Sequence, residues 1–255
     1  MNPLASIGRT VIAFFATIGR ISLFSINAAS HCFQPPFYGR ILGRQLVEIG
    51  YYSLPVVGLT AIFTGMVLAL QSYTGFTRFN AEDAIASVVA LSITRELAPV
   101  LAGLMVAGRI GAAMAAEIGT MKVTEQIDAL ESISLDPIAY LVFPRVFAGI
   151  IMFPVLIIIA DIFGISGGVF AAATSLDIDT YQFMKGFKTW FKPWDAWYGV
   201  IKGLSFGIAI TTISCFYGFY TKGGAAGVGK STTSSVVVSC VAIMLLDYIL
   251  AALLL

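Results

Sequence analysis

The feature that most constrains this chain is the length of its apolar segments. Five largely apolar stretches occupy residues 46–73, 84–113, 138–175, 196–220 and 232–255. A helix needs about 20 apolar residues to cross about 30 Å of hydrocarbon, and each stretch is long enough. We therefore predict an all-α integral membrane protein with five transmembrane helices.

The composition fits a protein whose main solvent is lipid. Of the 255 residues, 58% are hydrophobic and 11% are charged, whereas soluble domains carry about 25% charged residues. No long polar block interrupts the chain, so we expect one membrane domain over residues 1–255, with an interfacial region at 1–40 and a five-span core at 41–255. The net charge of +1 argues against binding to nucleic acid. Three cysteines and the single His31 give no metal-binding pattern, so no cofactor is expected in this chain.

Residues 3–30 have the pattern of a helix that lies on the membrane surface. Apolar residues recur at spacings of three and four, which is the period of an amphipathic helix. Arg9 and Arg20 are eleven positions apart, so they fall within roughly 20° of each other on a helix. An apolar face opposite a cationic face suits an interfacial helix. The alternative is a short first span, but Arg9 and Arg20 leave too few apolar residues to cross the bilayer.

Residues 224–231 read Gly-Ala-Ala-Gly-Val-Gly-Lys-Ser and match the phosphate-loop pattern letter for letter. That pattern binds ATP when it follows a β-strand and opens a helix. Here the preceding segment is predicted to be a membrane helix. We therefore interpret the match as spurious and predict a flexible loop at 221–231, with Ser231 or Thr232 capping the last helix.

Residues 115–136 differ from the apolar stretches on either side because they carry many acids. We predict a polar helix there, with acids on one side and four apolar residues on the other: Ile118, Met121, Ile127 and Leu130. Lysine and arginine are more numerous before the first span and around the second and fourth loops. The positive-inside rule then places the N-terminus and the 115–136 segment in the cytoplasm, and the C-terminus in the periplasm.

The same region carries a long and specific motif. It reads Arg95-Glu-Leu-Ala-Pro99, Ala107-Gly-Arg109, Ala116-Glu-Ile-Gly-Thr-Met121, Thr124-Glu-Gln-Ile-Asp-Ala-Leu-Glu131, Asp136-Pro137 and Pro144-Arg145. From about residue 40 to the C-terminus the chain resembles the MlaE permeases. These are membrane subunits of ABC-type systems that move phospholipids or related hydrophobic molecules between bacterial membranes.

The resemblance implies a permease of the bacterial inner membrane that works as a homodimer. Two cytoplasmic ATPase subunits would bind the ATP and magnesium, a periplasmic MCE-domain ring would complete the path, and some systems add a small STAS-domain protein. Residues 115–136 match the coupling helix of the family, which sits in a groove of the ATPase. The coupling residues expected here are Glu117, Gly119, Met121, Glu125, Gln126, Asp128 and Leu130.

The charges within the spans have two interpretations. Arg95 and Glu96 are adjacent, so they point about 100° apart and cannot fully pair with each other. They could line the polar part of a lipid cavity, or each could form an ion pair with another helix. Asp161 and Asp247 are expected to form structural hydrogen bonds, with a proton relay as the lesser alternative. The candidate residues of the lipid cavity are Leu68, Leu70, Gln71, Tyr73, Arg95, Glu96 and Leu97.

Two other classes of membrane protein would need features of their own in the sequence. A membrane enzyme of the CDP-alcohol phosphotransferase type needs clustered aspartates on facing helices, and an intramembrane serine protease needs a histidine within a span. The sequence has neither. A secondary transporter or channel would be expected to show an internal repeat or a filter-like loop, and neither is visible.

Overall fold

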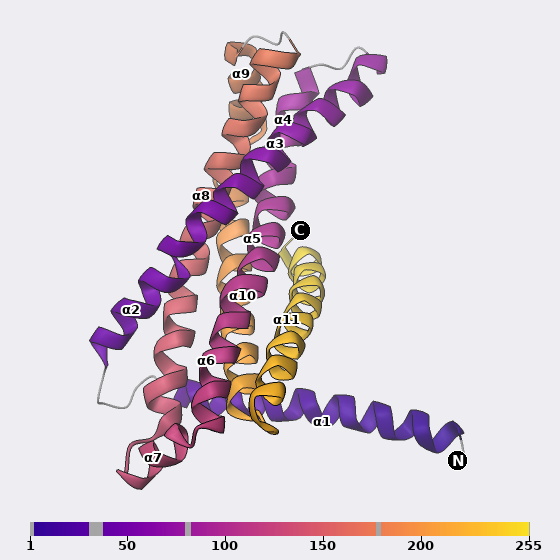
Figure 1. Ribbon diagram of the computed structural model, residues 1–255. Helices are drawn as coiled ribbons and strands as arrows, with labels where there is room; N and C mark the ends of the chain where they lie inside the picture. Colours follow the sequence, from indigo (N-terminus) through magenta and orange to yellow (C-terminus); the bar gives the residue numbers. More distant parts are fainter. Residues whose placement is uncertain (1–2, 31–37, 80–82, 177–179, 255) are drawn as a thin grey trace.

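The computed structural model describes residues 3–30, 38–79, 83–176 and 180–254, and within these ranges the chain forms helices and no strand (Figure 1). His31 and Cys32 lie outside the described residues. The helices are α1 (Pro3–Ser30), α2 (Gly39–Ile49), α3 (Leu54–Phe76), α4 (Asp83–Ser92), α5 (Ala98–Val106), α6 (Ala112–Val123), α7 (Gln126–Ser132), α8 (Phe143–Ser175), α9 (Thr180–Trp190), α10 (Pro193–Phe219) and α11 (Gly224–Leu254).

Short 3-10 and π-helical turns join several of these helices end to end. The turns are 3-10 at η2 (Tyr51–Ser53) and η3 (Thr77–Phe79), and π-helical at η4 (Ile93–Leu97), η5 (Ala107–Gly111) and η6 (Ile138–Val142). Helices α4, α5 and α6 thereby form one continuous rod through η4 and η5. The prediction of an all-α membrane protein is confirmed.

Six helical segments of the described chain are long and apolar enough to cross a membrane. Five of them form the bundle: Gly39–Phe76, Ala84–Val123, Ile138–Ser175, Pro193–Phe219 and Gly224–Leu254. The sixth is Val11–Ala28 within α1. Figure 1 shows α1 lying across the lower end of the bundle and not along it. This direction agrees with the expected interfacial helix, and its Arg9 and Arg20 are exposed.

Two predicted boundaries are wrong. The second span does not end at residue 113, because α6 continues it to Val123. The predicted loop 221–231 is also wrong, because α11 begins at Gly224 and the hydroxyl of Thr232 donates to the Val228 carbonyl inside the helix. The helix forms despite its glycines because it packs on α6, where Val228 lies beside Gly119. Packing of this kind overrides the weak helix propensity of glycine.

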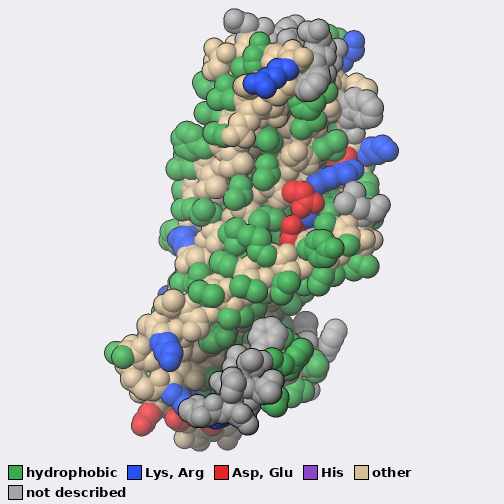
Figure 2. Space-filling view, turned by 90° about the vertical axis from the view of Figure 1, so that its right-hand side faces the viewer, with side chains coloured by type: hydrophobic (Ala, Val, Ile, Leu, Met, Phe, Trp, Pro, Cys, Tyr) green, Lys and Arg blue, Asp and Glu red, His purple; other side chains and the backbone are tan. Residues whose placement is uncertain are grey.

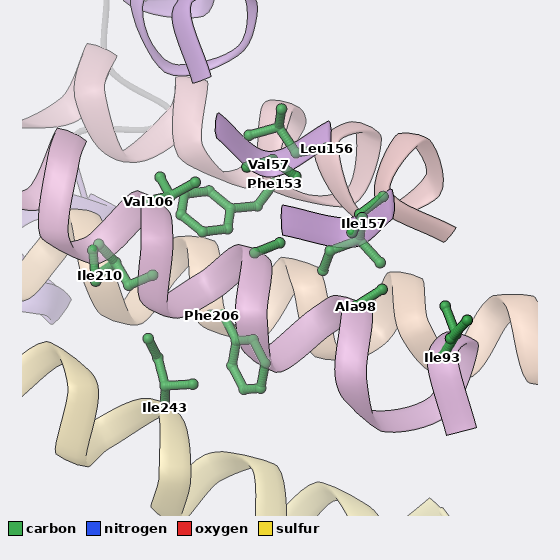
Figure 3. Close-up of a cluster of buried hydrophobic side chains, with 14 of the residues drawn as sticks. Val57, Ile93, Ala98, Val106, Phe153, Leu156, Ile157, Phe206, Ile210 and Ile243 are labelled. Atoms are coloured by element: carbon green, nitrogen blue, oxygen red, sulfur yellow. The ribbon is translucent and has the colours of Figure 1, made fainter. Parts of the chain in front are cut away.

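The core lies between α3, the α4–α6 rod, α8, α10 and α11 (Figure 3). Its labelled side chains are Val57, Ile93, Ala98, Val106, Phe153, Leu156, Ile157, Phe206, Ile210 and Ile243. Small residues bring α3 and α8 into close contact: a methyl group added to Gly65 would overlap the backbone carbonyl of Gly164. Close backbone approach at small residues is the usual way in which membrane helices associate.

This contact predicts opposite outcomes for two glycines on α3. Gly65→Ala should lower the free energy of unfolding by about 1–3 kcal/mol, because the added methyl group forces α3 away from α8. Gly75→Ala should leave stability unchanged or slightly raised, since a methyl group there meets nothing within 4 Å and alanine favours the helix. Unfolding in mixed detergent micelles measures both. Equal effects would contradict the packing argument.

A second apolar cluster anchors α1 to the lower end of the bundle. It contains Phe24, Ile118, Ile127, Leu141 and Phe216 among its buried members. The Phe24 ring packs edge-on against Phe216, with the ring centroids 5.7 Å apart. One turn of α1 is therefore fixed to α10, whereas most of its length remains exposed.

Candidate functional site

A network of ion pairs crosses the interior of the bundle. It begins at η4, where Arg95 donates from Nε and Nη2 to Oδ1 of Asp195 at 2.8 and 2.5 Å. Asp195 is buried near the start of α10, and its other oxygen accepts the backbone N–H of Lys192 at 2.8 Å. The carboxylate is thus held by both its own helix and Arg95.

The second half of the network centres on Lys202, which is 0% exposed. Its Nζ donates to Oε2 of Glu96 at 2.6 Å and lies 2.6 Å from Oδ1 of Asp247 on α11. The hydroxyl of Tyr198 donates to the other oxygen of Glu96 at 3.2 Å, and the Tyr198 ring faces the ammonium at 4.7 Å. One buried cation therefore joins three membrane helices.

This arrangement decides between the two interpretations of Arg95 and Glu96. Each forms an ion pair with α10, as the second alternative predicts, because isolated charges inside a bilayer are costly. Arg95 and Glu96 nevertheless keep 33% and 42% of their side chains exposed. Figure 2 shows acidic and basic side chains together partway up a surface that is mostly hydrophobic or uncharged.

The two lone aspartates differ from each other. Asp247 is paired with Lys202, as described above, so its expected polar partner within the bundle is present. Asp161 lies near Gly199 of α10, but its buried Oδ1 accepts no hydrogen bond from any residue that the structure describes. The hydrogen bond expected for Asp161 is therefore not found at this oxygen.

Sequence reasoning missed the role of Lys202 and Asp195. Lys202 follows a run of loop lysines in the sequence and resembles one of them, although it lies nine residues beyond the start of α10 at Pro193. Its position among apolar residues was the available signal, since a lysine inside a span needs an acidic partner. Asp195 gave no comparable signal because it stands in a stretch that is already rich in charge.

A polar stripe runs along α3 and continues into η3. Its members recur at spacings of three, four and seven, which place them on one helix face: Thr60, Thr64, Gln71 and Thr74 on α3, and Arg78 on η3. Thr60 and Thr64 face Leu97 and Leu101 across a narrow crevice. Gln71, Thr74 and Arg78 line a hollow of about 530 Å³ together with Leu70.

The predicted cavity residues are thus divided between different places. Leu70 and Gln71 line the larger hollow, whereas Leu97 lines the crevice. Leu68 and Tyr73 pack against the core of the chain itself. Arg95 and Glu96 belong to the ion-pair network, so the structure does not bring all seven into one pocket.

The 115–136 segment is not one helix, contrary to the prediction. Glu117, Gly119 and Met121 belong to α6, and Gln126, Asp128 and Leu130 belong to α7. Glu125 separates the two helices because it adopts a left-handed backbone conformation with φ of 61°, and Ser134 does the same after α7. Such positions are uncommon for residues other than glycine, so they define a distinct short helix held between two bends.

The two faces of the α6–α7 segment have different surroundings. Ile118 and Ile127 are fully buried in the second apolar cluster, and Met121 and Leu130 pack against it. The outward face carries Glu125, Gln126, Asp128 and Glu131, with the Asp128 carboxylate 2.7 Å from Lys122. The apolar side is therefore occupied by the chain itself, and the exposed side is acidic.

Glu117 and Gly119 of α6 contact neighbouring parts of the chain. Glu117 accepts a hydrogen bond at 2.8 Å from Arg145, which is buried at the start of α8. A methyl group on Gly119 would come within 2.9 Å of the Thr221 hydroxyl. Both residues thus fix α6 to its neighbours, α8 and the end of α10.

The phosphate-loop match lies within α11, from its first residue at Gly224 to Ser231. The element before it is α10, and no strand precedes it in the described chain. Consecutive helical residues cannot form the strand-to-helix turn whose backbone amides bind phosphates. The geometry agrees with the interpretation that the match is spurious.

These features define a class: a multi-pass helical membrane protein with an ion-pair network inside its bundle and an acidic helical segment at one end. The sequence profile of a family described as "Permease MlaE" matches residues 42–253. The chain therefore belongs to the MlaE permease family, as its motifs predicted.

Several relatives match over nearly their whole length. A "Probable ABC transporter permease protein" of Rickettsia felis is 51% identical over 253 residues, covering 99% of this chain and 98% of the relative. The Synechocystis "Probable ABC transporter permease protein slr1045" is 40% identical over 243 residues, covering 95% and 89%. The "Intermembrane phospholipid transport system permease protein MlaE" of Haemophilus influenzae is 36% identical over 255 residues, covering 99% and 97%.

Proposed function

We propose that this chain is the permease subunit of an ABC-type system that moves phospholipids between the inner and outer membranes of a bacterium. The observation that carries the proposal is the polar stripe of α3, which borders the apolar crevice at its middle and lines the larger hollow at its end. A phospholipid has a charged headgroup and apolar tails, so its path needs polar groups at membrane depth next to apolar walls. The proposal also agrees with the name of the Haemophilus influenzae relative.

The larger hollow on α3 is the proposed entry to this path. Leu70 supplies an apolar wall, whereas Gln71 and Thr74 supply hydrogen-bonding groups and Arg78 a cation. The hollow has a volume of about 530 Å³, but in the part of the chain that the structure describes only residues of α3 and η3 line it, so its other side is open. We propose that a second copy of the chain closes this side, as in the homodimer that the resemblance implies.

ATP hydrolysis is assigned to separate partner subunits, which would bind the nucleotide and magnesium. The acidic outer face of α7, with Glu125, Gln126 and Asp128, is the proposed contact with the ATPase. Met121 and Leu130 support this face from within, and Glu117 and Gly119 fix α6 behind it. A docked short helix can transmit movement to the rod and to α8, because α7 lies between them in the chain.

The proposed orientation places α7 and the N-terminus in the cytoplasm and the C-terminus in the periplasm of the inner membrane. Figure 1 places α1, α7 and the start of α11 at the same end of the bundle, and this end carries Arg9, Arg20 and Lys230. The positive-inside rule supports that assignment. The opposite end would then meet a periplasmic MCE-domain protein, and a STAS-domain protein would join the ATPases in some systems.

A blocking substitution tests the path. Gln71→Trp should reduce lipid transport to the background of membranes that lack the protein, because the indole fills the hollow on α3. Thr174→Trp is the matched control, since Thr174 is an exposed threonine on α8 whose hydroxyl bonds only its own helix. Transport is measured as movement of labelled phospholipid by the reconstituted complex with its ATPase. Full transport by a correctly folded Gln71→Trp variant would contradict the proposed path.

A further inference from the structure

The proposed transport path leaves one charged hollow of the molecule without a role. It lies where α1 crosses the ends of α10 and α11 and has a volume of about 300 Å³. We call it the α1 pocket. Residues of all three helices line it, including Arg20, Phe216, Tyr217, Tyr220, Lys230 and Ser231.

The charge of the α1 pocket is wholly positive. Arg20 comes from α1 and Lys230 from α11, whereas no acidic residue is among the lining residues. Arg20 donates to the Thr17 hydroxyl at 3.3 Å and to the Ala16 carbonyl at 3.4 Å. A guanidinium has five N–H donors, so these two long contacts leave donors for a ligand. Ser231 also lines the pocket, and its hydroxyl is a further hydrogen-bonding group.

Lys230 and Ser231 are the last two residues of the phosphate-loop match. The helical backbone of α11 excludes nucleotide binding of the phosphate-loop type, as shown above. Their side chains nevertheless reach a pocket that a second cation from α1 completes. Two cations and a hydroxyl without a nearby carboxylate suit a phosphate group.

The walls of the α1 pocket suit an amphiphile better than a free anion. Phe216, Tyr217 and Tyr220 form an aromatic wall, and tyrosine is enriched at the headgroup level of membranes. Leu23 lies one turn of α1 beyond Arg20 on a neighbouring face and is 69% exposed, so the surface next to Arg20 on this side is apolar and open. A lipid bound by its phosphate could therefore lay its acyl chains along α1.

We propose that the α1 pocket binds the phosphate group of an anionic phospholipid in the leaflet where α1 lies. The α1 pocket is separate from the hollow on α3, because the two share no lining residue and lie on different helices. The bound lipid would tie α1 to α10 and α11, with Phe24 holding the helix in register beside it. The site requires only that α1 lie at the membrane–water interface, so the proposed lipid binding does not depend on the proposed transport.

Native mass spectrometry of the full chain tests the site. The purified protein is released from detergent micelles that contain dioleoyl phosphatidylglycerol, and the retained lipids are counted. The Arg20→Gln/Lys230→Gln variant should bind the most tightly held lipid about thirtyfold more weakly, since each interfacial cation contributes about a factor of five. Arg9→Gln/Lys222→Gln is the matched control, because it removes the same charges at the same end of the molecule from exposed positions outside the α1 pocket.

Each outcome decides a different point. Loss of the lipid in the pocket variant alone supports the site, whereas equal loss in both variants would show nonspecific attraction and overturn it. Displacement of the lipid by millimolar inorganic phosphate would show a free-anion site and overturn the lipid assignment. Equal retention of dioleoyl phosphatidylcholine would overturn the preference for anionic lipid. Gln71→Trp should leave this lipid bound, so a failure of the transport proposal can be told apart from a failure of this one.

Discussion

Replacing Lys202 with methionine should lower the free energy of unfolding by about 3–5 kcal/mol, because removing one partner from a buried ion pair leaves the other charge unpaired. Here two carboxylates, Glu96 and Asp247, would lose the same cation, which is fully buried between them. Lipid transport should fall with stability, since Lys202 would no longer link α10 to Glu96 of η4 and to Asp247 of α11. Reversible unfolding in mixed detergent micelles measures the first effect.

Two controls test whether the lost stability comes from the broken ion pairs or from the removal of a lysine as such. Lys185→Met removes an exposed lysine on α9 and should change stability by less than about 0.5 kcal/mol. Adding Glu96→Gln and Asp247→Asn to Lys202→Met should recover most of the lost stability, because the unpaired charges are then removed. If the triple variant were as unstable as Lys202→Met alone, the charges would not be the cause.

The second large effect is expected at α7. Reversing two exposed acids, Glu125→Lys with Glu131→Lys, should weaken copurification of the ATPase at least about tenfold, because like charges across an interface cost several kcal/mol and about 1.4 kcal/mol is tenfold. The free permease should remain folded, since neither acid has an ion pair among the described residues. The measurement is the ratio of ATPase to permease after affinity purification.

The choice of acids in that experiment comes from the structure. Glu117 was also a predicted coupling residue, but its reversal would break the pair with buried Arg145 and would confuse folding with docking. Lys188→Glu is the matched control, because it reverses an exposed charge on α9 at the opposite end of the bundle. Unchanged copurification by the α7 variant would contradict the proposed docking face.

The overall architecture was predictable because long apolar runs have few alternatives. The third span, 138–175, coincides with η6 and α8, and the motifs identified the family. The positions of the charges were less predictable. Adjacency showed that Arg95 and Glu96 point apart, but their partners come from α10, about 100 residues later in the chain. Local sequence spacing carries no information about such contacts.

The errors at the acidic segment and at α11 have a common physical cause. The 115–136 segment was predicted as one polar helix, yet Met121 and Ile127 are six positions apart, which on one helix would place them about 120° from each other. The bend at Glu125 removes this difference. The apolar residues still gather on one side, against the second apolar cluster. At α11, four glycines from residue 223 to residue 229 suggested a loop, whereas Gly224, Gly227 and Gly229 lie in the helix that packs against α6. In both cases tertiary contacts decided the backbone.

The two π-helical turns of the α4–α6 rod, η4 and η5, have a consequence for how this protein tolerates changes of length. Each is a single wide turn within a helix, as if one residue had been inserted, and both lie in the rod between Asp83 and Val123. Because each turn accommodates one extra residue, deleting one residue from it, Arg95 excepted, would leave an ordinary α-helical turn and keep the residues beyond it in phase. A deletion elsewhere between Arg95 and Glu117 would instead rotate everything beyond it by about 100°, and Arg95 and Glu117 could then no longer meet Asp195 and Arg145 at once. The two turns are therefore the positions at which the rod best tolerates a change of length.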